Sequence, residues 1–183
     1  MATVTNVAAG KPKVGGAVSV AATNATLPTD ATTALGTGFA NLGYISEDGM
    51  TRAITRESDN IKAWGGDTVL AIQSEFGETF QFSLIESLNL DVKKVVFGDT
   101  NVTGAIGTGI TTTVNSKELT EHAWVIDMVT RGAVTRIVIP NGKVTEIGEI
   151  TYSDSDVIGY DITVTAFPDS TGNTSYEYTV TAA

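Results

Sequence analysis

The hydrophobic period changes once within residues 65–98, and this change constrains the fold more than any other feature of the chain. Apolar side chains first fall on alternate positions, on both sides of Gly77-Glu78, as they do in β-strands with one buried face. From Leu88 onward the apolar spacing becomes helical. The pattern predicts a β-hairpin that turns at Gly77-Glu78 and leads directly into one helix over about residues 87–97.

The predicted hairpin has two chemically different faces. The apolar face is expected to lie under the helix or a second sheet, and the apolar residues of the helical stretch are expected to face it. These sets are Leu70, Ile72, Phe80, Phe82 and Leu84 on the strands, and Leu88, Val92 and Val95 on the helix. The opposite face carries Gln73, Glu75, Thr79, Gln81 and Ser83. That face lacks the apolar groups needed to pack against another layer, so we expect it to stay polar.

Composition favours a mainly β protein. The chain has 183 residues and 19 glycines, and it contains many short runs of alternating hydrophobicity. Asn141-Gly142 lies between two such runs and predicts a type I′ hairpin turn. The length suits one domain, or one domain with a long arm.

The formal charge of −10 is distributed unevenly along the chain. Residues 144–183 hold seven acids and no Lys or Arg, whereas residues 1–38 are net +1 from Lys11, Lys13 and Asp30. Such a surface repels phosphates and offers no basic stripe for nucleic acid, although solubility alone would also explain the charge. The chain has no cysteine, which excludes disulfides and thiolate metal sites. We expect neither a membrane span nor an export signal, because no apolar run is long enough.

Two segments are poorly suited to pack by themselves. Residues 1–38 contain no aromatic residue and three charges, so we interpret them as an arm that is mobile or ordered by a neighbouring subunit. Val18 and Val20 could add a short strand there. Residues 47–66 form a long connection of mixed charge, and a connection of this length usually has a function. Its Trp64 is either an interface anchor or a side chain that folds back onto the core.

Chemical motifs are scarce. His122 is the only histidine and has no second histidine or cysteine with which to share a metal. Asp154 and Asp156 could contact calcium, but the remainder of an EF-hand loop is missing. No phosphate loop, dinucleotide fingerprint or nucleophile elbow occurs. We therefore predict no catalytic residue, no metal site and no cofactor.

Two segments of the chain resemble a known family. They are YISEDGMTRAITRESDNIKAWGGD (residues 44–67) and KVTEIGEITYSDSDVIGYDITVTAFPD (residues 143–169). Together with the hairpin-to-helix stretch between them, they resemble the major tail tube protein of long, non-contractile-tailed bacteriophages, particularly those infecting actinobacteria. The resemblance spans about residues 39–169. It implies a mainly β fold, a β-sandwich or split barrel of two packed sheets with one flanking α-helix. It also implies an extended N-terminal arm over residues 1–38 and a single tail-tube domain over residues 39–183.

The resemblance implies a structural virion protein and not an enzyme. In that family, hexameric rings stack into a tube that passes double-stranded DNA without binding it specifically. The implied partners are other copies of the chain, a tape measure protein, and tail terminator or distal tail proteins. The implied location is the virion tail, after synthesis in the bacterial host cytoplasm. The residues expected to stack rings are Arg52, Arg56, Glu57, Asp59, Lys62 and Trp64. Those expected to face the lumen are Gln73, Glu75, Gln81 and Ser83.

Two alternatives from other classes remain open on sequence grounds. A carbohydrate-binding or adhesive β-sandwich would need exposed aromatic side chains, for which Trp64, Tyr152, Tyr176 and Tyr178 are candidates. A small hydrolase would need a pair of carboxylates on neighbouring strands, and so acidic a chain places some together by chance.

Overall fold

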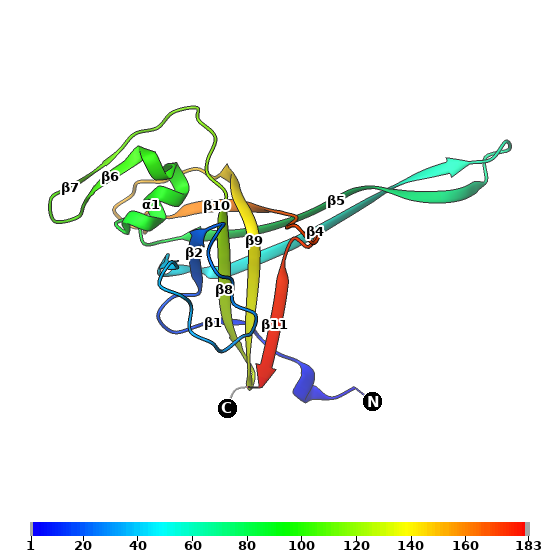
Figure 1. Cartoon of the computed structure of the whole chain (residues 1–183), viewed down its shortest axis with the longest axis horizontal. Coiled ribbons are helices and arrows are strands. Elements are labelled where there is room, and N and C mark those ends of the chain that lie inside the picture. The colour runs from blue at the N-terminus through cyan, green and yellow to red at the C-terminus, as the bar shows by residue number, and fades with distance from the viewer. Residues whose placement is uncertain (1, 182–183) are drawn as a thin grey trace.

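The computed structural model describes residues 2–181 and consists of a compact body from which a long two-stranded hairpin projects (Figure 1). Within those residues the chain forms strands, one α-helix and two short 3-10 helices. The strands are β1 (Lys11–Pro12), β2 (Val18–Ala22), β3 (Ala40–Asn41), β4 (Ile45–Lys62), β5 (Thr68–Leu84), β6 (Val102–Ala105), β7 (Gly109–Thr112), β8 (His122–Thr130), β9 (Ala133–Ile147), β10 (Tyr160–Phe167) and β11 (Tyr176–Thr181). The helices are α1 (Leu90–Phe97), η1 (Val4–Asn6) and η2 (Asp99–Asn101).

Nine of these strands form one antiparallel sheet. Its main path runs β3-β2-β8-β9-β10-β5-β4, with β1 added beside β8 and β11 beside β9, while β6 and β7 form a separate two-stranded sheet. In Figure 1 the β8, β9 and β11 strands run across the direction of β4, β5 and β10, so the large sheet bends over on itself. The predicted fold class is confirmed: residues 2–181 are mainly β, with two sheets and one α-helix.

The core lies inside this bend. It collects apolar side chains from both halves of the large sheet and from α1, and its largest member, Trp124 of β8, meets Phe82 of β5 edge to face with ring centroids 6.2 Å apart. Burial of Phe80, Phe82, Leu84, Val92 and Val95 is confirmed. Each fully buried large apolar side chain contributes about 1.5–3 kcal/mol relative to exposure. The core thereby fixes the body without any contribution from the outer part of the hairpin.

The helix α1 is confirmed, although it begins at Leu90 and not near residue 87. Asn89 caps its first turn by accepting a hydrogen bond from the Asp91 backbone N–H at 3.0 Å. Its buried residues Val92, Val95 and Val96 lie on the face toward the sheet. Leu88, expected on that face, precedes the helix and is exposed. The helix ends at Phe97 and is capped by Gly98, whose φ of 103° only glycine adopts readily.

The predicted turn at Gly77-Glu78 is wrong. β5 passes straight through these residues, and the hairpin is instead formed by β4 and β5, with its turn at residues 63–67. The segment 47–66, expected to be a connection, is therefore mostly strand. Leu70 and Ile72 are 52% and 50% exposed, so their predicted burial is also wrong. The reason is that β10 pairs with β5 only between Thr79 and Leu84, and from Glu78 toward the tip β5 pairs only with β4.

The predicted hairpin turn at Asn141-Gly142 is also wrong, because β9 continues through both residues. The strand changes neighbours here, since β11 pairs with it before this point and β10 after it. Gly142 is required by close packing: a Cβ at this position would lie 2.6 Å from Trp124 Cδ1. The Trp124 indole Nε1 donates to the Gly142 carbonyl at 3.0 Å. A glycine that resembled a turn signal instead makes room for the largest core side chain.

The N-terminal segment is divided between body and surface. The short strand suggested by Val18 and Val20 is confirmed as β2, which pairs with β8 and is buried at four of its five residues. Arg136 Nη1 donates to the carbonyls of Asp30 and Thr33 at 3.1 and 2.8 Å, and thereby holds the following loop against the sheet. Residues 2–14 remain exposed where their side chains are described.

Candidate assembly surfaces

The most unusual surface is the outer part of the β4–β5 hairpin, which we call the hairpin arm (residues 54–77). Here the two strands pair only with each other and project from the body (Figure 1). The arm exposes a set of large apolar side chains: Ile54, Ile61, Trp64, Val69, Leu70, Ile72 and Phe76. A two-stranded hairpin is marginally stable in water, and an exposed apolar patch of this kind marks a protein interaction surface.

Five of the six residues predicted to stack rings lie on this arm. Glu57, Asp59 and Lys62 are exposed along β4, and Trp64 lies fully exposed in the terminal turn. Arg56 places its guanidinium carbon 4.6 Å from the Phe76 ring centroid and donates to Gln73 Oε1 at 3.1 Å. The sixth residue, Arg52, lies at the base of the arm. Their role in ring stacking stays a prediction.

The arm contains an unfavourable charge pair. Glu57 and Glu75 lie directly opposite each other in the β4–β5 register, and both side chains are exposed. Like charges at such positions destabilise a hairpin by up to about 1 kcal/mol.

The base of the arm holds a buried carboxylate that sequence reasoning missed. Glu78 is 2% exposed and accepts hydrogen bonds from Arg52 Nε at 2.6 Å, from Ser175 Oγ at 2.9 Å and from Thr174 Oγ1. Arg52 also donates to Glu177 Oε2 at 2.9 Å and to Ser175 Oγ at 3.0 Å. One feature of the sequence does indicate its burial: Glu78 is two positions from both Phe76 and Phe80, and therefore lies on the strand face expected to be buried.

The predicted lumen residues fall into two groups. Gln73 and Glu75 lie on the arm, whereas Gln81 and Ser83 lie on the outer face of the large sheet in the body. Gln81 is part of a hydroxyl-rich surface, the threonine face, which spans β4, β5, β10 and β9. Its threonines are Thr51, Thr79, Thr163, Thr165 and Thr145. Thr145 and Thr165 are hydrogen-bonded at 2.8 Å between their hydroxyl oxygens. This face is polar and carries few charges.

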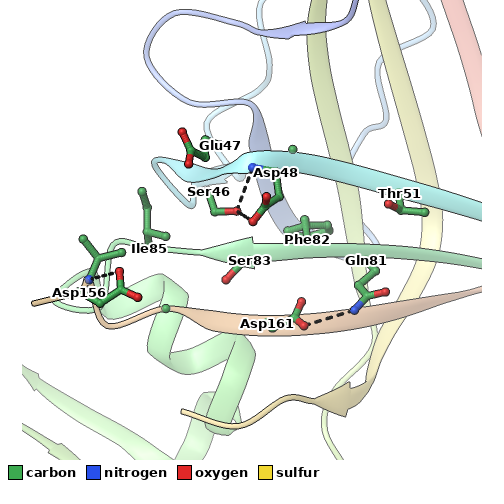
Figure 2. A pocket seen from close by; sticks show the side chains of 13 residues that line it. Ser46, Glu47, Asp48, Thr51, Gln81, Phe82, Ser83, Ile85, Asp156 and Asp161 are labelled. Carbon is green, nitrogen blue, oxygen red and sulfur yellow. Dashed lines mark hydrogen bonds between the residues drawn. The ribbon is translucent and has the colours of Figure 1, made fainter. Parts of the chain in front are cut away.

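An acidic groove of about 720 Å³ adjoins the threonine face (Figure 2). Its carboxylates are Glu47, Asp48, Asp156 and Asp161, and its described lining includes no Lys, Arg or His. Figure 2 shows Asp161 accepting from Gln81 Nε2, at 3.2 Å, and Asp48 accepting from Ser46 Oγ, at 3.3 Å. Among residues 2–181 no group of three side chains suits a metal ion. The groove adds negative potential beside the threonine face, which disfavours bound phosphate.

Two further carboxylates order loops of the body. Hydrogen bonds from the Thr33 hydroxyl, and then from the Thr33 and Thr32 backbone N–H groups, lower the pKa of Asp30 from 3.8 to about 2. This is the loop that Arg136 holds against the sheet. The Tyr176 hydroxyl, followed by the Thr171 hydroxyl, holds the pKa of Asp169 well below its usual range. Both carboxylates act locally, because their bonds are to residues within seven positions of the chain.

Of the four aromatic candidates for carbohydrate binding, only Tyr176 and Tyr178 are brought together, with ring centroids 6.4 Å apart. Trp64 lies at the tip of the arm, Tyr152 on the connection between β9 and β10, and Tyr176 and Tyr178 on β11, which are three separate parts of the molecule (Figure 1). The Tyr176 hydroxyl is already engaged by Asp169 at 2.6 Å. A stacking platform for a sugar needs neighbouring, accessible rings. Tyr176 and Tyr178 are half-buried and stack on each other, and Trp64 and Tyr152 lie elsewhere, so this arrangement does not favour such a module.

His122 has a local structural partner. Its Nε2 lies 3.2 Å from Asp99 Oδ2, and its ring meets Trp124 edge to face. In the described part of the chain, no helix has the length and apolar character needed to cross a membrane.

Comparison with known proteins identifies a family for this chain. A family model described as phage tail tube protein matches residues 9–181. No curated protein matches the sequence. Among solved structures, the chain is similar to a chain from an extracellular contractile injection system, the PVC sheath-tube complex in its extended state. That similarity has a TM-score of 0.46 and 8% sequence identity, and it covers 93% of each chain.

Proposed function

The chain belongs to the phage tail tube protein family, and from this premise we propose that it forms stacked hexameric rings in the tail of a phage with a long, non-contractile tail. Membership of the family makes it a structural component of the virion tail. The finer assignment, including hexamers, the non-contractile type and an actinobacterial host, is our proposal and follows the resemblance of residues 44–67 and 143–169.

The observation that carries the proposal is the hairpin arm. It exposes seven large apolar side chains on two strands that pair only with each other, with the loop of residues 172–175 beside them at the base. A free monomer gains nothing from this element, whereas a neighbouring copy would bury it. We propose that the arm contacts the adjacent ring, with Trp64 as its apolar anchor and with Arg56, Glu57, Asp59 and Lys62 as the surrounding polar contacts.

We further propose that the threonine face, with Gln81 and Ser83, lines the channel of the tube. Gln73 and Glu75 would continue this polar wall along the arm into the neighbouring ring. Hydroxyl groups and few charges offer DNA no strong binding point, and the acidic groove adds repulsion. Six copies would carry about −60 formally, which discourages DNA from adhering to the wall even though salt screens it within about 8–10 Å.

The N-terminal segment contributes to assembly only in part under this proposal. Because β2 supplies buried side chains to the body and β1 pairs with β8, we place the contact of this segment with another subunit on the exposed residues before β1. The other partners follow from the family role: a tape measure protein inside the tube, tail terminator or distal tail proteins at its ends, and double-stranded DNA in transit. Synthesis would take place in the host cytoplasm.

Negative-stain electron microscopy of the purified protein at high concentration tests this function. We expect six-fold rings or tubes with a continuous central channel. A protein that stays monomeric at every concentration and salt condition would contradict self-assembly and favour a binding module.

A further inference from the structure

We propose that Glu78 is a positioning residue for assembly, because with Arg52, Thr174 and Ser175 it sets the direction in which the hairpin arm leaves the body. This inference rests on the proposed role of the arm in contacting the next ring. It goes beyond that role by identifying what holds the arm in a defined orientation before any partner is bound.

Glu78 stands at the boundary between body and arm. Counting inward from the tip, it is the first buried residue of β5. The pairing of β10 with β5 ends one residue further inward, at Thr79, so from Glu78 outward β5 has only β4 as a neighbour. The adjacent Gly77 has no side chain to stiffen the strand. A two-stranded ribbon can pivot at such a point unless something outside the ribbon holds it.

The holding contacts come from both sides of the junction. Arg52 of β4 and the residue pair Thr174-Ser175 donate three hydrogen bonds to the Glu78 carboxylate. Arg52 extends the connection, because it also bonds Glu177 of β11 and lies with its guanidinium carbon 5.5 Å from the Phe80 ring centroid. The arm is thus tied to a segment more than 90 positions away in the sequence.

That segment is itself rigid. Asp169 accepts from the Thr171 backbone N–H at 2.8 Å, from the Asn173 backbone N–H at 3.1 Å and from the Tyr176 hydroxyl at 2.6 Å. These bonds fix the loop between β10 and β11 so that Thr174 and Ser175 are already directed at Glu78. The contact therefore joins the arm to a fixed point on the body and not to a mobile loop.

A positioning role explains why a carboxylate occupies this site. Burying a charged group is costly unless it is fully hydrogen-bonded, and an apolar side chain of similar size would fill the space at lower cost. A satisfied network defines one geometry, whereas apolar packing tolerates several. The geometry matters here because the arm extends about 40 Å beyond Glu78, so a pivot of about 10° moves the tip by about 7 Å.

The test uses Glu78→Gln, which keeps the side-chain size and removes the charge. Because the chain has no cysteine, nitroxide labels can be placed cleanly at Asn60→Cys on the arm and Glu121→Cys on the body. Pulsed electron paramagnetic resonance on the unassembled protein then reports the distance between arm and body. We expect one narrow distribution for the parent chain and a broad one for Glu78→Gln. The concentration needed for tube formation should rise about tenfold if a tenth of the arms keep the competent orientation.

Two further variants keep the outcome decisive. Val96→Ala removes buried volume from α1, away from the arm, and should lower the melting temperature while leaving the distance distribution narrow. Thr174→Ala combined with Ser175→Ala removes two of the donors and should broaden the distribution even if Glu78→Gln fails to fold. A narrow, unshifted distribution in the folded Glu78 or Thr174/Ser175 variants would overturn the inference. The proposed role of the arm has a separate test: normal tube formation by a chain lacking residues 57–74 would overturn it. The distance distribution between arm and body would still test the role of Glu78 in that case.

Discussion

The body and the hairpin arm are built from the same two strands, yet they have opposite surroundings. Along β5, apolar residues recur with a period of two from Leu70 to Leu84. In the body, Phe80, Phe82 and Leu84 are buried in one core with residues of α1 and β8, whereas in the arm Leu70, Ile72 and Phe76 are exposed. The difference shows that strand periodicity reports which face is apolar and does not report what covers that face. In the body the cover is part of the chain, and for the arm we propose that it is another copy.

The largest expected effect is on the free energy of unfolding, when matched apolar residues of β5 are truncated in the body and in the hairpin arm. Phe82→Ala should lower the free energy of unfolding by about 3–5 kcal/mol, because its buried ring contacts Trp124. Leu70→Ala, in the same strand and facing solvent, should change it by less than about 0.5 kcal/mol. Denaturant unfolding of the monomer measures both. Equal losses at the two positions would mean that the arm folds onto the body in solution.

Trp64→Ala separates folding from assembly. Because the side chain is fully exposed at the tip, its removal should leave monomer stability unchanged. If Trp64 anchors the contact between rings, tube formation should weaken by about 2 kcal/mol or more per contact. Light scattering against protein concentration measures the assembly threshold. An unchanged threshold would remove Trp64 from the interface.

Arg56→Glu tests the polar contacts of the arm and should act more weakly. Arg56 is exposed and stacks on Phe76, so partly screened ion pairs with a neighbouring copy would contribute at most about 1 kcal/mol each. The variant should raise the assembly threshold at low salt and have little effect at high salt. An effect of Arg56→Glu that does not change with salt would contradict this prediction. It would mean that Arg56 acts through packing and not through its charge.

The smallest expected effect is a local response to pH in the body. Hydrogen bonds lower the pKa of Asp30 from 3.8 to about 2, so the ionised carboxylate orders its loop above pH 3.8. This contribution is lost as the pH falls from about 4 through 2. Nuclear magnetic resonance of the Thr32 and Thr33 amides should show a transition in that window, and Asp30→Asn should abolish it. Arm resonances near Asn60 should not follow the same transition.

Much of the body could be predicted from the sequence, because its signals are local. The helix has a cap at Asn89 and a glycine at its end, and Phe80 to Leu84 alternate cleanly. The hairpin turn was misplaced because Gly77-Glu78 preserves the two-residue period on both sides, so nothing in the pattern distinguishes a turn from a continuous strand. Gly142 was misread because its requirement comes from Trp124, which is distant in the sequence.

The candidate sites were predicted less completely than the fold. The segment with Arg56 and Trp64 was identified as an assembly element from its charge and its lack of packing, although a continuous strand of 18 residues was not expected there. Gln73 and Glu75 were grouped with Gln81 and Ser83 because they share a strand face, but the arm separates the two pairs in space. Glu78 falls in phase with the buried residues of β5, but its partners could not be predicted, because Arg52 meets it from β4 and Thr174 and Ser175 meet it from the loop before β11.

A three-dimensional reconstruction of the assembled tube by electron cryo-microscopy tests the central claim most directly. The account predicts that the hairpin arm of each subunit is covered by a subunit of the adjacent ring, with Trp64 buried in that contact, and that Gln81 and the threonine face line the channel. An arm left in solvent on the outside of the tube, or a threonine face on the outer wall, would contradict the account.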